Sequence, residues 1–328
     1  MKKLNFFALL LLSFSMVACS SSDDAAGDGG DDPTTENEDP TINDPDGLYT
    51  VADAPTFADG HDPIYDGMVW NKVGDLSDEF NGTELDTDKW CADPEANGWQ
   101  WLGRAPQLFM PESISVKGGT MQILAGILDE PIEKESYGST ETYKYHSGIV
   151  RSLKSAIVGN YYECRMKMNK SELGGGFWVN VQSAVNGYSH EIDIQECVGY
   201  VDESFTESWA LGWDHIAHSN AIYKPTGGDQ SRDSGALYLD TKNHENYHVH
   251  GAWWKSANEI LIFLDGEHID TLIPPADFDI PSYVQFSIEM YDWNIVPEEG
   301  SQLATLPEED RISHVDWIRV WRPETHNF

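Results

Sequence analysis

The stretch His190-Glu191-Ile192-Asp193-Ile194-Gln195-Glu196 places three carboxylates within six residues and separates them by two isoleucines. Successive side chains of a β-strand point to opposite faces, so Glu191 and Asp193 share one face while the isoleucines share the other. A regular strand would turn Glu196 away from the other acids, but one extra residue, a β-bulge, restores it to their face. We therefore predict a bulged strand with three carboxylates on one face and an apolar anchor beneath them.

A row of three acids needs a chemical reason, because like charges this close repel and raise one another's pKa. A retaining glycosidase requires one carboxylate as nucleophile and another as proton donor, with the carboxyl groups about 5–5.5 Å apart. Glu191 and Glu196 are the natural pair, since their long side chains can lean together from the two ends of the row. Asp193 lies between them and would help to set which glutamate is charged. The alternative is a surface strand with solvated acids, which the surrounding Trp, Phe and Tyr residues disfavour.

The sequence on either side of this stretch predicts an all-β fold. Short alternating runs recur with glycine-containing turns between them, and convincing amphipathic helices are scarce. The strands are predicted over residues 113–116, 121–124, 148–151, 161–168, 176–181, 190–196, 247–254, 259–264, 284–290 and 315–321. Many short strands over about 260 residues fit a two-sheet β-sandwich with one cleft-bearing face.

The hexapeptide from Glu191 to Glu196 resembles the E-x-D-x-x-E signature of glycoside hydrolase family 16, in its bulged form. The likeness runs from about Asp78 to the C-terminus, and residues 78–82, 161–167, 176–178 and 315–321 all have family counterparts. The resemblance implies a β-jelly roll with a concave substrate cleft. It also implies that Glu191 is the nucleophile, Asp193 a helper and Glu196 the general acid/base.

The substrate is predicted from a second resemblance. Residues 101–106, with 112–116 behind them, are similar to the region shared by β-agarases, porphyranases and κ-carrageenases. This likeness implies cleavage of β-1,4 galactosidic bonds in red-algal galactans. The Gly-Arg-Ala-Pro form at 103–106 and the acidity of the chain favour neutral agarose over sulfated porphyran. A β-porphyranase is the second choice, followed by a κ-carrageenase or a laminarinase.

The charge of the chain bears on its partners. Its 328 residues include 20 Lys and Arg against 56 Asp and Glu, a formal net charge of −36. Nucleic acid requires a cationic face, so it is excluded as a partner. Acidity also counts mildly against a densely sulfated substrate, although a local pocket of Arg or Lys could override the average. We expect a polysaccharide substrate, no required cofactor and a monomer.

Aromatic residues are the first candidates for sugar binding, because pyranose rings stack their C–H faces on aromatic planes. Trp178 resembles the tryptophan that floors the family's subsite at the scissile bond, with ordinary core packing as the alternative. Trp99 and Trp101 lie in a glycine-containing loop, where exposed aromatics favour binding.

Polar candidates come next. Glu289 resembles a cleft glutamate of the agarase group, and Arg104 and Arg151 could bind sugar or form salt bridges. In family 16 a histidine-containing strand follows the catalytic strand, so His215 or His218 is expected to touch substrate.

Two histidines three apart, with no third ligand nearby, do not predict a metal site. The resemblance makes a structural calcium possible, with Asp316 as a candidate ligand, although the sequence does not establish the site.

The N-terminus predicts export. Lys2 and Lys3 precede an apolar run over residues 4–14 that is too short to span a membrane. Ala18 directly before Cys19 resembles a bacterial lipoprotein signal, with a plain secretory signal as the alternative. We therefore expect Cys19 to be lipidated and the protein to be anchored in the outer membrane at the cell surface.

Three segments follow from this interpretation. Residues 1–18 would be the signal peptide and residues 19–59 an acidic, flexible tether. The tether is predicted because residues 20–47 contain almost no large apolar residue and cannot bury enough surface to offset ordering entropy. Residues 60–328 would form the catalytic domain. The competing class of function is a surface lipoprotein that binds glycan without cutting it; such proteins usually lack a catalytic acid, and all three acids are present here.

Overall fold

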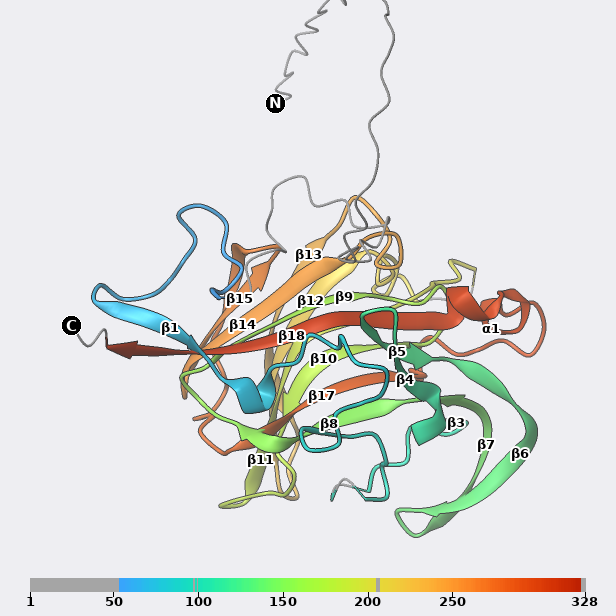
Figure 1. Cartoon of the computed structure of the whole chain (residues 1–328). Helices are drawn as coiled ribbons and strands as arrows, with labels where there is room; N and C mark the ends of the chain where they lie inside the picture. The colour runs from blue at the N-terminus through green and yellow to red at the C-terminus, as the bar shows by residue number, and fades with distance from the viewer. Residues whose placement is uncertain (1–52, 97, 99, 205–206, 326–328) are drawn as a thin grey trace, which may run out of the picture. The chain divides into compact units, whose positions relative to one another are not determined.

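The computed structural model describes residues 53–96, 98, 100–204 and 207–325 (Figure 1). The predicted signal peptide, Cys19, most of the predicted tether and Trp99 lie outside the described residues. Nearly all the regular structure is β, which confirms the predicted class. The short helical elements are η1 (Gly74–Leu76), η2 (Pro111–Ser113), α1 (Gln302–Thr305) and η3 (Glu308–Arg311). No helix in the described part of the chain is long and apolar enough to cross a membrane.

The described strands form two large sheets and a smaller one (Figure 1). One large sheet has the order β16 (Glu267–Leu272), β15 (Glu259–Leu264), β14 (His248–Ser256), β9 (Tyr161–Lys167), β18 (Ile312–Thr325), β5 (Thr120–Leu124) and β4 (Ile114–Lys117), with β1 (Met68–Lys72) also paired to β18. The other, called here the cleft sheet, has the order β13 (Ser231–Tyr238), β12 (Ile216–Pro225), β11 (Tyr188–Val198), β10 (Gly174–Asn180), β17 (Ser282–Glu289), β8 (Ile149–Ala156) and β2 (Trp90–Cys91). The small sheet has the order β3 (Gln107–Phe109), β7 (Ser139–Ser147) and β6 (Gly126–Ser136).

The main hydrophobic core lies between the two large sheets, because each sheet contributes one face of alternating apolar residues. Phe177 of β10 and Phe286 of β17 stack in this core with ring centroids 5.1 Å apart. Ile192 and Ile194 of β11 belong to the same core cluster, which confirms the apolar anchor predicted beneath the acids. Fully burying one such side chain stabilises the fold by about 1.5–3 kcal/mol. The core therefore fixes which face of β11 is turned outward.

Several strands were not predicted. The hairpin of β6 and β7 and the strand β13 were missed. The alternation pattern did not predict β12 either, but β12 follows β11 and contains His218, as the histidine-containing strand implied by the resemblance would. The three described cysteines, Cys91, Cys164 and Cys197, are all free, and Cys164 and Cys197 are buried.

Candidate active site

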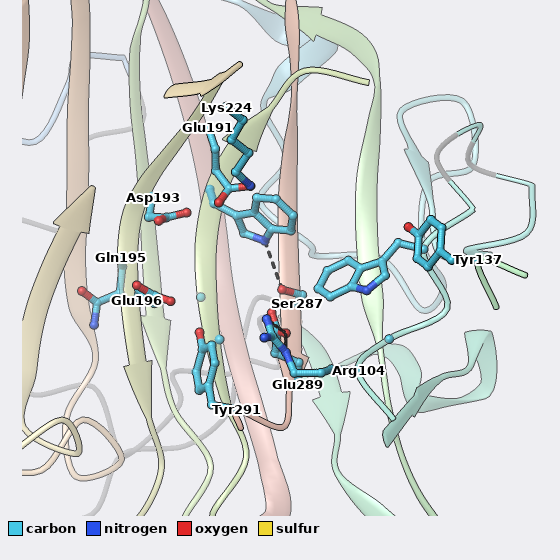
Figure 2. Close-up of a pocket in the computed structure, with 15 residues that line it drawn as sticks. Arg104, Tyr137, Glu191, Asp193, Gln195, Glu196, Lys224, Ser287, Glu289 and Tyr291 are labelled. Atoms are coloured by element: carbon cyan, nitrogen blue, oxygen red, sulfur yellow. Dashed lines mark hydrogen bonds and ion pairs between the residues drawn. The ribbon is translucent and has the colours of Figure 1, made fainter. Parts of the chain in front are cut away.

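The predicted β-bulge is present in β11. Asp193 pairs with Trp178 of β10, while Gln195 pairs with the preceding residue of β10, Phe177, so Ile194 is the extra residue. Glu191, Asp193 and Glu196 consequently all line one cleft of about 470 Å³ (Figure 2). The sequence pattern thus predicted both the bulge and its effect on Glu196.

Gln195 closes the gap that the bulge opens towards β12. Regular pairing of β11 with β12 reaches Asp193 and Asn220. Beyond that point the Gln195 side chain donates to the Ile216 carbonyl at 2.9 Å and accepts from the His218 amide at 3.1 Å. A buried amide side chain here replaces ladder hydrogen bonds and holds the strand in its bulged form.

Glycines of β10 keep the space in front of Glu196 open. Gly176 pairs with Glu196, and a Cβ at Gly176 would lie 1.8 Å from the Gln195 carbonyl oxygen. No other residue fits at that distance, because the neighbouring atom is backbone and cannot move aside. Gly175 and Gly176 both line the cleft, so its wall beside the acid is bare backbone.

Glu191 is held by two donors on one oxygen. The Asn180 amide donates to Glu191 Oε2 at 2.7 Å, and the Lys224 ammonium donates to the same atom at 2.9 Å. Burial alone would lower the pKa of Lys224, but the charge and hydrogen bond of Glu191 raise it above its ordinary value. Lys224 therefore stays charged and, with Asn180, fixes the orientation of the carboxylate.

Asp193 and Glu196 are bridged by one side chain. Asn220 Nδ2 donates to Asp193 Oδ2 at 3.0 Å and to Glu196 Oε2 at 2.9 Å. Asn220 is itself oriented by the Ser234 hydroxyl, which donates to Asn220 Oδ1 at 2.6 Å. Burial, and after it the charges of Glu191 and Glu196, hold the pKa of Asp193 well above its ordinary value. Asp193 thus binds a proton more readily than an ordinary aspartate does.

Two further groups lie near Glu196. His218 Nδ1 lies 3.3 Å from Glu196 Oε2, and Tyr291 lines the same cleft. Burial, followed by the charge of Glu196, raises the pKa of Tyr291 well above its ordinary value, so the phenol remains a donor. Trp213 packs on His218 with ring centroids 4.5 Å apart and fixes the imidazole from behind.

Glu289, from the neighbouring strand β17, adds a fourth carboxyl group to the cleft (Figure 2). Arg104 donates to Glu289 Oε2 through Nε at 3.2 Å and through Nη2 at 3.0 Å. Burial raises the pKa of Glu289 to about 7; Arg104 opposes this shift, and the charges of Glu196 and Glu191 add to it. The cleft therefore contains two carboxyl groups, those of Asp193 and Glu289, that bind protons more tightly than ordinary acids.

The predicted tryptophans form one side of the cleft. Trp178 and Trp101 both line it, with ring centroids 6.1 Å apart and planes at 82°. The Trp178 indole donates to the Ser287 hydroxyl at 3.0 Å, which fixes the ring (Figure 2). Trp178 is only 7% exposed and packs on Phe109 and Ile149, so it is both a core residue and part of the cleft wall.

Three predicted sugar-binding residues that the structure describes, Arg151, His215 and His218, lie outside the residues that line this cleft. The Arg151 guanidinium stacks 3.7 Å above the Tyr283 ring and donates to Gln182 Oε1 at 2.9 Å. His215 Nδ1 lies 2.9 Å from Asp214 Oδ1. His218 is the member of the histidine pair that reaches an acid of the row.

The predicted calcium ligand has another partner. Asp316 Oδ2 accepts from Arg165 Nη1 at 2.6 Å, and a carboxylate paired with a guanidinium is a poor calcium ligand. Within the described ranges, no group of three or more His, Cys, Asp or Glu side chains could hold a metal ion. The calcium stays a prediction.

Sequence reasoning missed several residues of the site. Asn180 follows Trp178 by two positions on the same strand, so alternation along β10 could have identified it. Asn220 and Lys224 of β12 could not be found in this way, because their pairing with β11 joins residues about thirty apart.

Known proteins resemble this chain in sequence and in fold. The family model described as the GH16 domain of β-porphyranases A–D matches residues 70–323. The chain belongs to glycoside hydrolase family 16. It is a glycosidase, and the jelly-roll fold is that of its family neighbours.

Individual relatives give a finer comparison. β-Porphyranase B of Zobellia galactanivorans is 37% identical over 278 residues, which cover 82% of this chain and 90% of that protein. Its crystal structure superimposes with a TM-score of 0.75 over 82% of this chain and 99% of that one. A β-agarase of Phocaeicola plebeius is 26% identical over 78% of this chain and 86% of that protein. These family 16 relatives support a galactan hydrolase, and they favour porphyranase over agarase, which reverses the order predicted from the sequence.

Proposed function

We propose that this family 16 glycosidase cleaves the β-1,4 galactosidic bonds of porphyran inside the chain and retains the anomeric configuration. The observation that carries the proposal is the difference in similarity to known relatives: 37% identity to a β-porphyranase against 26% to a β-agarase, over comparable lengths of chain.

The charges that line the cleft support a sulfated substrate. Among the described residues of its wall, the cationic side chains are Arg104 and Lys224, in a chain whose overall net charge is −36. The raised pKa of Asp193 and the pKa of about 7 at Glu289 reduce the negative charge that an incoming sulfate ester would meet. A sulfate needs fixed donors, which guanidinium and ammonium groups supply.

In the proposed mechanism, Glu191 attacks the anomeric carbon while Glu196 protonates the departing glycosidic oxygen. Asn180 and Lys224 support this assignment, because both donate to Glu191 Oε2 and hold the side chain in one orientation. Glu196 then removes a proton from the water that hydrolyses the glycosyl–enzyme ester. The charge of Glu196 changes as it gives up and regains its proton. Asp193 responds to this change, because Asn220 donates a hydrogen bond to both carboxyl groups.

Agarose is the second candidate substrate, because Arg104 is already paired with Glu289, and Lys224 with Glu191. The test is to incubate the purified protein with porphyran, agarose, κ-carrageenan and laminarin, and to measure new reducing ends and product sizes. We expect cleavage of porphyran at least about ten times faster than that of the others. Faster release of reducing ends from agarose than from porphyran would make agarose the substrate. Binding of a polysaccharide without new reducing ends would establish the glycan-binding alternative.

We also propose that Cys19 is lipidated and anchors the protein at the cell surface, as the sequence before it predicts. Labelling of cells with a fatty-acid analogue should mark the wild-type protein and leave a Cys19→Ala variant unlabelled. Equal labelling of both would exclude Cys19 as the anchor.

A further inference from the structure

One wall of the cleft carries an aromatic residue at the tip of a long hairpin. Strands β6 and β7 are joined by the two-residue turn Tyr137-Gly138, which the pair of Ser136 and Ser139 closes. Tyr137 is 79% exposed, the largest exposed fraction of any bulky hydrophobic side chain in the described ranges. It nevertheless lines the same cleft as the acids.

The backbone at this tip disfavours a tyrosine. Both turn residues have positive φ, 49° at Tyr137 and 87° at Gly138. Such a turn favours Asn or Asp followed by Gly, because a bulky side chain is strained in the left-handed region. Gly138 fits this rule and Tyr137 does not. A ring that is both strained and exposed adds little to folding, and strained residues of this kind concentrate at functional sites.

The hairpin holds Tyr137 in a fixed position relative to the loop with Trp101 and Arg104. Tyr143 of β7 is fully buried in a cluster with Leu102 and Leu108, on which Ile132 of β6 also packs. Nearer the tip, Lys134 Nζ lies 2.9 Å from Glu95 Oε1. The wall is therefore anchored to the protein at its base and along its length.

Tyr137 lies across the cleft from the row of acids formed by Glu191, Asp193 and Glu196. In Figure 2 it stands on the opposite side from Asp193 and Glu196. Trp101, which also lines the cleft, belongs to the loop that the base of the hairpin supports. An aromatic plane in this position can meet a sugar ring other than the one whose bond is cut.

We propose that Tyr137 is a stacking platform for a galactan sugar unit remote from the scissile bond, and that the hairpin thereby sets the preference for long substrate chains. This inference rests on the proposed function, because it assumes a polysaccharide in the cleft. The phenol face would stack on the C–H face of the sugar, which is how aromatic rings bind pyranoses. Stacking depends on the ring and not on the hydroxyl, so phenylalanine would serve in its place.

The test compares Tyr137→Asn, Tyr137→Phe and wild type on porphyran and agarose oligosaccharides of increasing length. Asn suits the turn, so the variant should fold and melt at the wild-type temperature or above it. We expect kcat/KM of Tyr137→Asn to fall about tenfold on long oligosaccharides and to stay unchanged on the shortest one that is cut. Tyr137→Phe should match wild type throughout.

A matched control is Tyr65→Asn. Tyr65 is also more than half exposed, but it packs on Trp253 of the sheet that does not form the cleft. Tyr65→Asn should leave the dependence of kcat/KM on oligosaccharide length unchanged. An equal loss by Tyr137→Asn at every length, or no loss at any length, would overturn the role of Tyr137. If wild type cuts agarose and not porphyran, the proposed substrate fails, and the length dependence on agarose still decides the role of Tyr137.

Discussion

Replacement of Glu289 by glutamine should make the protein more stable near neutral pH. Glu289 is only 6% exposed, and burial raises its pKa from 4.5 to about 7 in spite of Arg104. A folded-state pKa above the unfolded value means that the folded protein binds the proton more tightly, so stability falls as pH rises through this window. The ionised carboxyl group thus opposes folding at neutral pH.

The magnitude follows from the width of the window. A pKa raised from 4.5 to about 7, at about 1.36 kcal/mol per pH unit, costs the folded state roughly 3 kcal/mol above pH 7. Glu289→Gln removes this cost and keeps an oxygen that can accept from Arg104. We expect the free energy of unfolding to rise by about 1–3 kcal/mol at pH 8, and by much less at pH 4.5.

The assay is denaturant unfolding of wild type and Glu289→Gln at pH 4.5, 6, 7 and 8. Glu267→Gln is the control, because Glu267 is exposed on the sheet that does not form the cleft and should change the free energy of unfolding by less than about 0.5 kcal/mol. A difference in the free energy of unfolding between wild type and Glu289→Gln that is the same at every pH would show that the ionisation of Glu289 does not cause it. A gain in stability of Glu289→Gln over wild type that is smaller at pH 8 than at pH 4.5 would contradict the prediction as well.

Three further changes test other parts of the site. Lys224→Met removes the ammonium group that lies 2.9 Å from Glu191. We expect kcat on porphyran to fall at least tenfold and the melting temperature to fall by only a few degrees. An unchanged kcat would exclude a role for this ion pair in catalysis. Asn220→Ala removes the side chain that hydrogen-bonds both Asp193 and Glu196, and we expect the pH profile of kcat/KM to shift. A loss of kcat/KM by the same factor at every pH would indicate a structural role only. Gly176→Ala places a Cβ against the Gln195 carbonyl and should cost about 3 kcal/mol or more in the free energy of unfolding, measured by denaturant; a stable variant would contradict the close approach of β10 and β11.

The part of this site that sequence predicts is the part carried by local alternation. Within β11 the acids and isoleucines alternate around one bulge, so their faces follow from strand geometry alone. Lys224 and Asn220 reach the acids through strand pairing between distant segments, which no local pattern encodes. The β6–β7 hairpin was missed because its exposed strands are rich in charged residues and its turn begins with tyrosine where Asn or Asp is usual.

The choice of substrate shows a second limit of prediction from sequence. The acidity of the whole chain favoured a neutral polysaccharide, yet Arg104 and Lys224 line the cleft itself. Average charge describes long-range attraction and not the few groups that a sugar touches. The positions of Arg151 and His215 outside the cleft wall depend on packing that the sequence does not reveal.

In the proposed mechanism, Glu191 carries out the first chemical step. Its most direct test is the release of reducing ends from porphyran by wild type and by Glu191→Ala, with binding of porphyran oligosaccharides measured in parallel by calorimetry. We expect Glu191→Ala to release no oligosaccharide and to bind oligosaccharides within about tenfold of the wild-type affinity, because Trp101, Trp178 and Arg104 still line the cleft. Release by Glu191→Ala at the wild-type rate would contradict it.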